Sequence, residues 1–167
     1  MGIRSITGRM RAVNALLLGA EAHANAEGAD ETAAEHIVLA ALEDADGSAV
    51  NALARVGLTA EDFRTALAEH RSAALSAFGI TAPELPAVDP QGVSTRQGRY
   101  RMSPGGKRLF EQVVRHRGDS GSPAALGAMV VLALCDVRTG AAAGALERLG
   151  VDRDALAEAA RAEIAAA

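Results

Sequence analysis

An internal repeat limits the fold of this chain more than any other feature of its sequence. Residues 37–58 and 130–151 align without a gap at a constant offset of 93 positions. The matched pairs include Gly47 with Gly140, Leu53 with Leu146, and Gly57 with Gly150. Upstream, Thr7 aligns with Ser103 at an offset of 96, so the first copy is longer by three residues. The chain therefore consists of two copies of one unit, and its fold must accommodate both.

The composition favours helices for both copies. Apolar residues make up 49 % of the 167 residues, but only 2 % are aromatic and none is Trp. A core must then be built from Ala, Leu and Val, and Ala and Leu are strong helix formers. A chain of this length can bury about 70 % of its unfolded surface as one domain. We predict an all-α fold, an eight-helix pseudo-twofold tandem repeat of two four-helix units.

Local signals predict where the helices begin and end. Gly57 is expected to end a helix in the left-handed conformation, and the hydroxyl of Thr59 to cap the next helix at the amide of Asp62. Pro104 and Pro123 are expected in first turns, where a missing amide hydrogen does no harm. The predicted helices cover residues 7–26, 33–43, 48–56, 59–74, 103–117, 123–135, 140–149 and 152–166.

The two copies are separated by a linker rich in Pro and Gly. The predicted organisation is a first repeat over residues 1–76, a linker loop over 77–101 and a second repeat over 102–167, together forming one compact domain. The linker carries the one local basic cluster, Ser94, Thr95, Arg96, Gln97, Arg99, Tyr100 and Arg101. This cluster either contacts an acidic partner or is simply solvated.

The sequence lacks the residues that several classes of function require. The net charge of −4 offers no basic excess to follow a phosphate backbone, so no nucleic-acid partner is expected. No apolar run reaches the length of a membrane span, and a cytoplasmic protein is expected. Cys135, the single cysteine, lies in an apolar run and is interpreted as a buried, inert thiol.

We expect neither a metal site nor a cofactor. The four histidines have no second His or Cys at ligand spacing, and His36 is interpreted as a core or helix-start histidine that bonds a backbone carbonyl. The chain has a single Lys and no Gly-x-x-x-x-Gly-Lys-Ser/Thr loop, which excludes ATP hydrolysis by this segment.

Two stretches of the sequence resemble a known repeat. Residues 34–42 (AEHIVLAAL), followed by Asp46-Gly47 and residues 52–58 (ALARVGL), resemble the repeat of the Clp amino-terminal domain. That repeat reads Gly-Thr-Glu-His, an apolar helix, a Glu-Gly turn and a helix that closes in Leu-Gly. Residues 102–111 (MSPGGKRLFE) resemble the opening of the second repeat of that family. The chain is identified as a free-standing member of the Clp amino-terminal domain (Clp repeat) family, without the ATPase.

The resemblance implies ligand-binding positions. Glu35 stands where the family's Glu accepts the guanidinium of phosphoarginine, but its counterpart in the second repeat is Ala128. On its own chemistry, Glu35 is equally an acidic residue that the helix dipole favours in a first turn. Three further positions, Ile3, Ile6 and Met102, together with Lys107, match the groove where cyclic peptides and adaptors dock; the alternative is ordinary core and surface residues.

These observations lead to a ranked set of functions. The first is a non-catalytic protein- and peptide-binding module that acts as adaptor, decoy or ligand-sequestering protein in Clp-dependent proteolysis. Its partners would be Clp machinery, adaptors or substrates, or phosphoarginine and cyclic peptides, bound by a monomer or weak homodimer. The alternative is a regulatory or structural homo-oligomer with no Clp role. An enzyme is least favoured, because no nucleophile motif is present.

Overall fold

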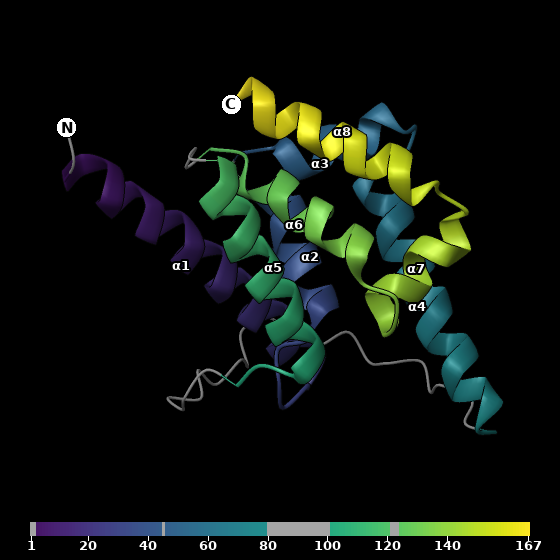
Figure 1. Ribbon diagram of the computed structural model, residues 1–167. Coiled ribbons are helices and arrows are strands. Elements are labelled where there is room, and N and C mark those ends of the chain that lie inside the picture. The colour runs from purple at the N-terminus through teal and green to yellow at the C-terminus, as the bar shows by residue number, and fades with distance from the viewer. Residues whose placement is uncertain (1–2, 45, 80–100, 121–123) are drawn as a thin grey trace.

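The computed structural model describes residues 3–44, 46–79, 101–120 and 124–167, and within these residues the chain forms eight α-helices and no strand (Figure 1). Four helices precede residues 80–100 and four follow them. The all-α prediction is confirmed. The helices are α1 (Ile3–Ala26), α2 (Ala34–Glu43), α3 (Ser48–Arg55), α4 (Ala60–Ala77), α5 (Pro104–Ser120), α6 (Leu126–Asp136), α7 (Ala141–Leu149) and α8 (Arg153–Ala166).

Most of the predicted helix boundaries are confirmed to within a few residues. Gly57 has a positive φ of 75°, as expected for the residue that ends α3. The Thr59 hydroxyl accepts a hydrogen bond from the Asp62 amide at 3.1 Å, and the Asp62 carboxylate accepts one from the Thr59 amide at 2.8 Å. This reciprocal pair caps α4. Pro104 is the first residue of α5, whereas Pro123 lies outside the described residues.

The predicted start of α6 is wrong by three residues, since the helix begins at Leu126 rather than at residue 123. Ala125 has φ 60° and ψ 37°, a left-handed conformation that a continuing helix cannot contain. The amides at the start of α6 then find partners in the first unit. Asp46 accepts from the Gly127 amide at 3.0 Å, and the Ser48 hydroxyl accepts from the Ala128 amide at 2.8 Å.

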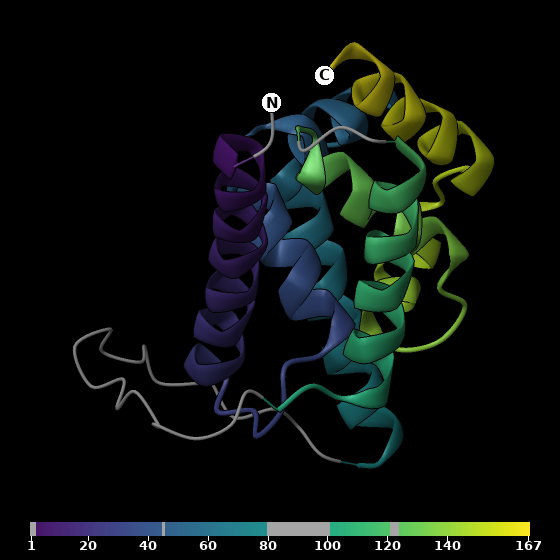
Figure 2. The same cartoon turned by 60° about the vertical axis from the view of Figure 1, so that its left-hand side comes forward.

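Helices α2 and α6 form the centre of the core. Every residue of α2 from His36 to Leu42 is buried, and so is every residue of α6 from Leu126 to Cys135. Figure 2 shows α1 and α5 on either side of α2. No single helix among the described residues is both long and apolar enough to cross a membrane; α6 and α7 reach that threshold only as a pair bent by 87°.

Equivalent residues of the two units meet across a pseudo-twofold axis. Helix α4 packs on α7 as α8 packs on α3. In the first contact, the ring of His70 lies over Gly144, where an added methyl group would come within 2.1 Å of the ring. In the second contact, Glu163 accepts hydrogen bonds from Asn51 at 3.3 Å and from Arg55 at 2.6 Å. Positions 51 and 144, like positions 70 and 163, differ by the repeat offset of 93.

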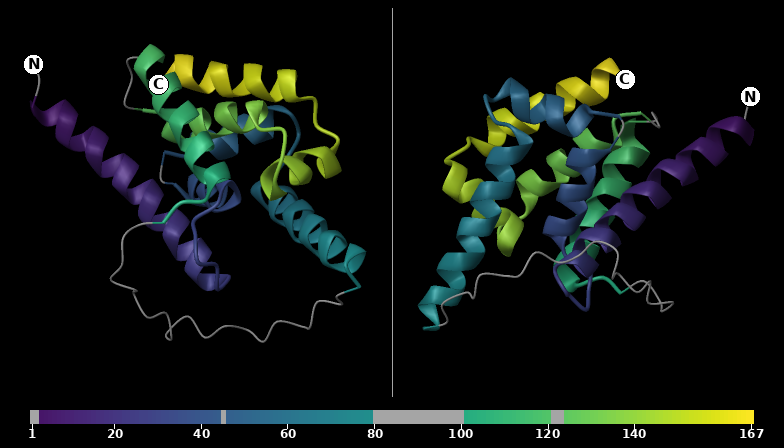
Figure 3. Two further views of the ribbon diagram at one scale, coloured as in Figure 1. Left: turned by 60° about the horizontal axis from the view of Figure 1, so that its bottom comes forward. Right: turned by 180° about the vertical axis from the view of Figure 1, so that it is seen from behind.

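Not every contact between helices follows this symmetry. Helix α8 packs along α6, but its equivalent in the first unit, α4, does not pack closely along α2 (Figure 3). The first unit is therefore more open than the second between its second and fourth helices.

A close backbone contact joins the starts of α2 and α5. The Thr32 amide donates to the Arg101 carbonyl at 2.8 Å, and the Ser103 amide donates to the Thr32 carbonyl at 3.0 Å. Gly106 faces this junction, and a methyl group there would lie 2.6 Å from the Thr32 carbonyl oxygen. The junction fixes which ends of the two helices are neighbours.

Replacing Gly106 by alanine is expected to destabilise the fold, because backbone atoms cannot yield to the new methyl group. We expect Gly106→Ala to lower the free energy of unfolding by about 1–3 kcal/mol in urea denaturation. The control is Gly105→Ala, whose methyl group meets only the Ser103 hydroxyl at 3.9 Å and should be neutral or stabilising. Equal stability of the two variants would contradict the described junction.

Candidate functional site

The candidate site is organised around His36, a buried histidine in the first turn of α2. Only 2 % of this residue is exposed. Its Nδ1 accepts a hydrogen bond from the Ala33 amide at 2.9 Å, which caps the helix in place of an N-cap side chain. Its Nε2 lies 2.7 Å from a carboxylate oxygen of Glu27. Because Nδ1 is an acceptor, the ring hydrogen of the neutral imidazole sits on Nε2 and is donated to Glu27.

The sequence interpretation of His36 was thus correct in location and wrong in the partner. The ring occupies the core at a helix start, but it bonds a backbone amide and a carboxylate rather than a carbonyl. Both ring nitrogens are occupied. Within the described residues, no three His, Cys, Asp or Glu side chains gather as a metal site would require.

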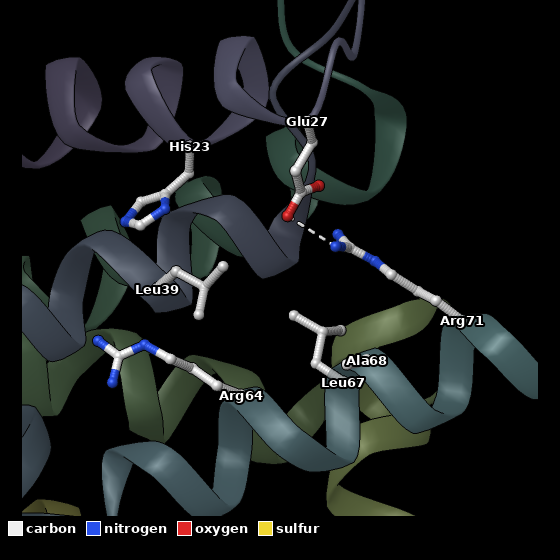
Figure 4. A pocket seen from close by; sticks show the side chains of 7 residues that line it. All are labelled: His23, Glu27, Leu39, Arg64, Leu67, Ala68 and Arg71. Atoms are coloured by element: carbon white, nitrogen blue, oxygen red, sulfur yellow. Dashed lines mark hydrogen bonds and ion pairs between the residues drawn. The ribbon is translucent and has the colours of Figure 1, made fainter. Parts of the chain in front are cut away.

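Glu27, the residue that follows α1, connects three helices. One carboxylate oxygen accepts from His36 on α2, and the other accepts from Arg71 Nη1 on α4 at 2.6 Å (Figure 4). Burial alone would raise the pKa of Glu27, but the hydrogen bonds from His36 and Arg71 and the charge of Arg71 outweigh it and lower the pKa to about 2. This carboxylate remains ionised at any pH at which the protein is expected to function.

Arg71 links this group to Glu35, the candidate residue of the sequence analysis. Its Nη2 lies 3.3 Å from Glu35 Oε1, and the Glu35 side chain is 15 % exposed. Burial alone would lower the pKa of Arg71, whereas the hydrogen bond and charge of Glu27 and the charge of Glu35 raise it. The guanidinium is thus held by two carboxylates, and Glu35 is the more distant of them.

Ala128, the position in the second unit that is equivalent to Glu35, differs from it in charge and burial. Ala128 is fully buried and carries no charge. The amides of Gly127 and Ala128 at this end of α6 already bond Asp46 and Ser48 from the first unit. The second unit therefore lacks the carboxylate that Glu35 supplies in the first unit, and two amides at the start of α6 are already bonded.

Two of the groove residues lie at the same end of the molecule as Glu35. Met102 forms the bridge with Thr32, directly before α2, and is half-buried. Lys107 lies in the first turns of α5 and is exposed. The close contact between the starts of α2 and α5 therefore places Glu35, Met102 and Lys107 near one junction.

The structure does not bring Ile3 and Ile6 to this junction. Both residues belong to the first turns of α1, and their side chains lie outside the described part of the chain. A helix of 24 residues is about 36 Å long. The bridge at Thr32 follows the other end of α1, and Figure 1 shows α1 projecting away from the other helices toward the N-terminus.

The family of this chain is identified by its similarity to known proteins. A model of the Clp repeat (R) N-terminal domain matches residues 11–139, more than three quarters of the chain. The chain belongs to the Clp repeat N-terminal domain family. No curated protein matches it. In general, Clp repeat domains are non-catalytic modules that bind Clp substrates and adaptors.

The match ends before α7, yet the internal repeat continues. Helices α7 and α8 lie beyond residue 139, but their contacts mirror those of α3 and α4 through the pairs His70–Gly144 and Glu163–Asn51. The last two helices of this Clp repeat domain are therefore recognised by internal symmetry.

Substituting Glu27 should change how the stability of this Clp repeat domain depends on pH. A carboxyl group whose pKa falls from 4.5 to about 2 on folding contributes stability above pH 4.5, and this contribution is lost as the pH falls towards 2. We expect Glu27→Gln to cost about 1–2 kcal/mol at pH 7, after discounting for partial exposure, and to flatten the loss of stability between pH 4.5 and 2.

The control for this prediction is Glu43→Gln. Glu43 also accepts from a histidine and an arginine, His23 and Arg64, but its side chain is 52 % exposed. Chemical denaturation at several pH values should show a much smaller effect for this variant. An unchanged acid profile in Glu27→Gln would contradict the role given to Glu27.

Proposed function

We propose that this Clp repeat domain recruits proteins or peptides to Clp-dependent proteolysis as an adaptor, a decoy or a ligand-sequestering protein, and that it catalyses no reaction. The general role of the family supports this reading, because its domains bind Clp substrates and adaptors. The proposed contact surface is the junction at the starts of α2 and α5, with Glu35, Met102 and Lys107.

The observation that carries this proposal is the carboxylate of Glu35 facing a guanidinium. Charge-assisted bonds between a guanidinium and a carboxylate are among the stronger polar contacts in proteins. Arg71 is bound tightly to Glu27 at 2.6 Å and more loosely to Glu35 at 3.3 Å. The guanidinium group of a ligand can therefore pair with Glu35 while Arg71 remains paired with Glu27. Such a ligand has to displace only the weaker of the two ion pairs of Arg71.

The second unit is not expected to bind a second copy of such a ligand. Ala128 offers no carboxylate, and the neighbouring amides of α6 are occupied by Asp46 and Ser48. A ligand that requires a charged partner is thus expected at the first unit alone.

The environment of the single cysteine supports the non-catalytic part of the proposal. The Cys135 thiol is buried and donates to the Val131 carbonyl at 3.2 Å. Burial and the charge of Asp136 raise the pKa of Cys135 to about 11. A thiol with such a pKa is almost entirely protonated at neutral pH, and the thiolate is the form that attacks substrates.

Calorimetric titration with phosphoarginine and with an arginine-phosphorylated protein tests this proposal. We expect Glu35→Ala to lose binding and Arg71→Gln to strengthen it about tenfold, because the competing guanidinium is removed. Glu147→Ala serves as control, since that side chain is 70 % exposed on α7. Binding that survives in Glu35→Ala would overturn the proposed surface. Light scattering addresses the alternative function, which requires a stable homo-oligomer.

A further inference from the structure

The opening between α2 and α4 is explained by the side chains at two pairs of equivalent positions in the repeat. Arg64 and Arg71 of α4 correspond, at the offset of 93, to Ala157 and Ile164 of α8. Ala157 is buried and Ile164 packs against the core, so α8 lies directly on α6. The two arginines are much larger and keep their charges in ion pairs. They hold α4 away from α2.

The space that results is a pocket of about 330 Å³. This volume lies at the lower end of the range for small-ligand sites, about 300–1,000 Å³. The pocket is lined by His23, Glu27, Leu39, Arg64, Leu67, Ala68 and Arg71 (Figure 4). Its walls are the end of α1, the middle of α2 and the middle of α4, so it lies away from the junction of α2 and α5. Arg71 belongs both to the pocket and to the contact with Glu35.

The lining divides into an apolar middle and two polar ends. Leu39 from α2 and Leu67 from α4 face each other across the middle (Figure 4), where they form a floor of which only 6 % and 3 %, respectively, is exposed, beside the exposed Ala68. Arg64 and His23 lie at one end, and the ion pair of Glu27 with Arg71 closes the other. A ligand that matches this lining has a short aliphatic group next to one anionic group.

The end at Arg64 is the one that can exchange partners. Arg64 bonds Glu43 at 3.0 Å and lies 3.6 Å from Glu61, and these two side chains are 52 % and 78 % exposed. Exposed ion pairs of this kind contribute little to stability and are readily replaced. The pair of Glu27 with Arg71 is shorter and less exposed. Glu43 also bonds His23 at 3.1 Å, so an incoming carboxylate that displaces Glu43 is expected at Arg64 and His23.

We propose that this pocket binds the carboxyl-terminal residue of a protein or peptide that ends in an aliphatic side chain. The terminal carboxylate takes the place of Glu43 and accepts hydrogen bonds from Arg64 and His23, and the aliphatic side chain packs against Ala68 and the floor of Leu39 and Leu67. The inference rests on the proposed function, since the carboxyl-terminal residue would belong to the recruited protein and would bind at a second site, the pocket between α2 and α4.

Titration followed by amide chemical shifts tests the site with the peptide acetyl-Ala-Ala-Ala-Leu. The free acid should shift residues of the pocket, and the same peptide with a carboxamide terminus should bind about tenfold more weakly, because it lacks the charge. Arg64→Gln should weaken binding of the free acid to a similar degree. The matched control is Arg161→Gln, an exposed arginine on α8 that is paired with Glu158.

A steric block separates this site from the rest of the surface. Ala68 is exposed and lines the pocket, so Ala68→Phe should fill the space without unfolding the domain and should abolish peptide binding. Glu35→Ala should leave peptide binding intact, which distinguishes failure of this site from failure of the proposed function. The proposal would be overturned if the free acid and the carboxamide bound with equal affinity, or if Ala68→Phe bound the peptide unchanged. It would also be overturned if the pocket bound octanoate but not the peptide.

Discussion

The carboxylate of Glu27 holds together the part of the molecule on which recognition is proposed to depend. It receives a hydrogen bond from His36, whose other nitrogen caps α2, and an ion pair from Arg71 of α4. A single charge thus fixes the start of α2, the end of α1 and the distance to α4. Removing it would leave the buried imidazole hydrogen of His36 without its acceptor, which is costly in a protein interior, and would leave Arg71 with only the more distant Glu35.

In the second unit, apolar packing rather than an ion pair holds the fourth helix against the second helix. Ala157 and Ala160 bring α8 onto α6, and Asp46 and Ser48 cap α6 from the other unit. The pseudo-symmetry of the Clp repeat domain is therefore a symmetry of the backbone. Its side chains differ between the units: α8 packs directly on α6 in the second unit, whereas exposed ion pairs of Arg64 lie beside the opening of the first unit.

The sequence predicted the helices well, because caps and glycines act locally. Thr59 with Asp62 and the left-handed Gly57 needed only neighbouring residues. The site was less predictable, since Arg71 lies 36 positions from Glu35 and reaches it through tertiary packing. Glu27 falls in the region of the three extra residues of the first copy, where the repeat gives no guide. The left-handed Ala125 also carries no local signal.

Ligands are proposed to bind the first unit and not the second. Chemical-shift mapping of the backbone amides and the arginine side chains, with an arginine-phosphorylated peptide, tests this proposal most directly. The largest shifts are expected at Glu35, His36 and the Arg71 side chain, with Gly127 and Ala128 unchanged. Shifts centred on Gly127 and Ala128 would contradict it.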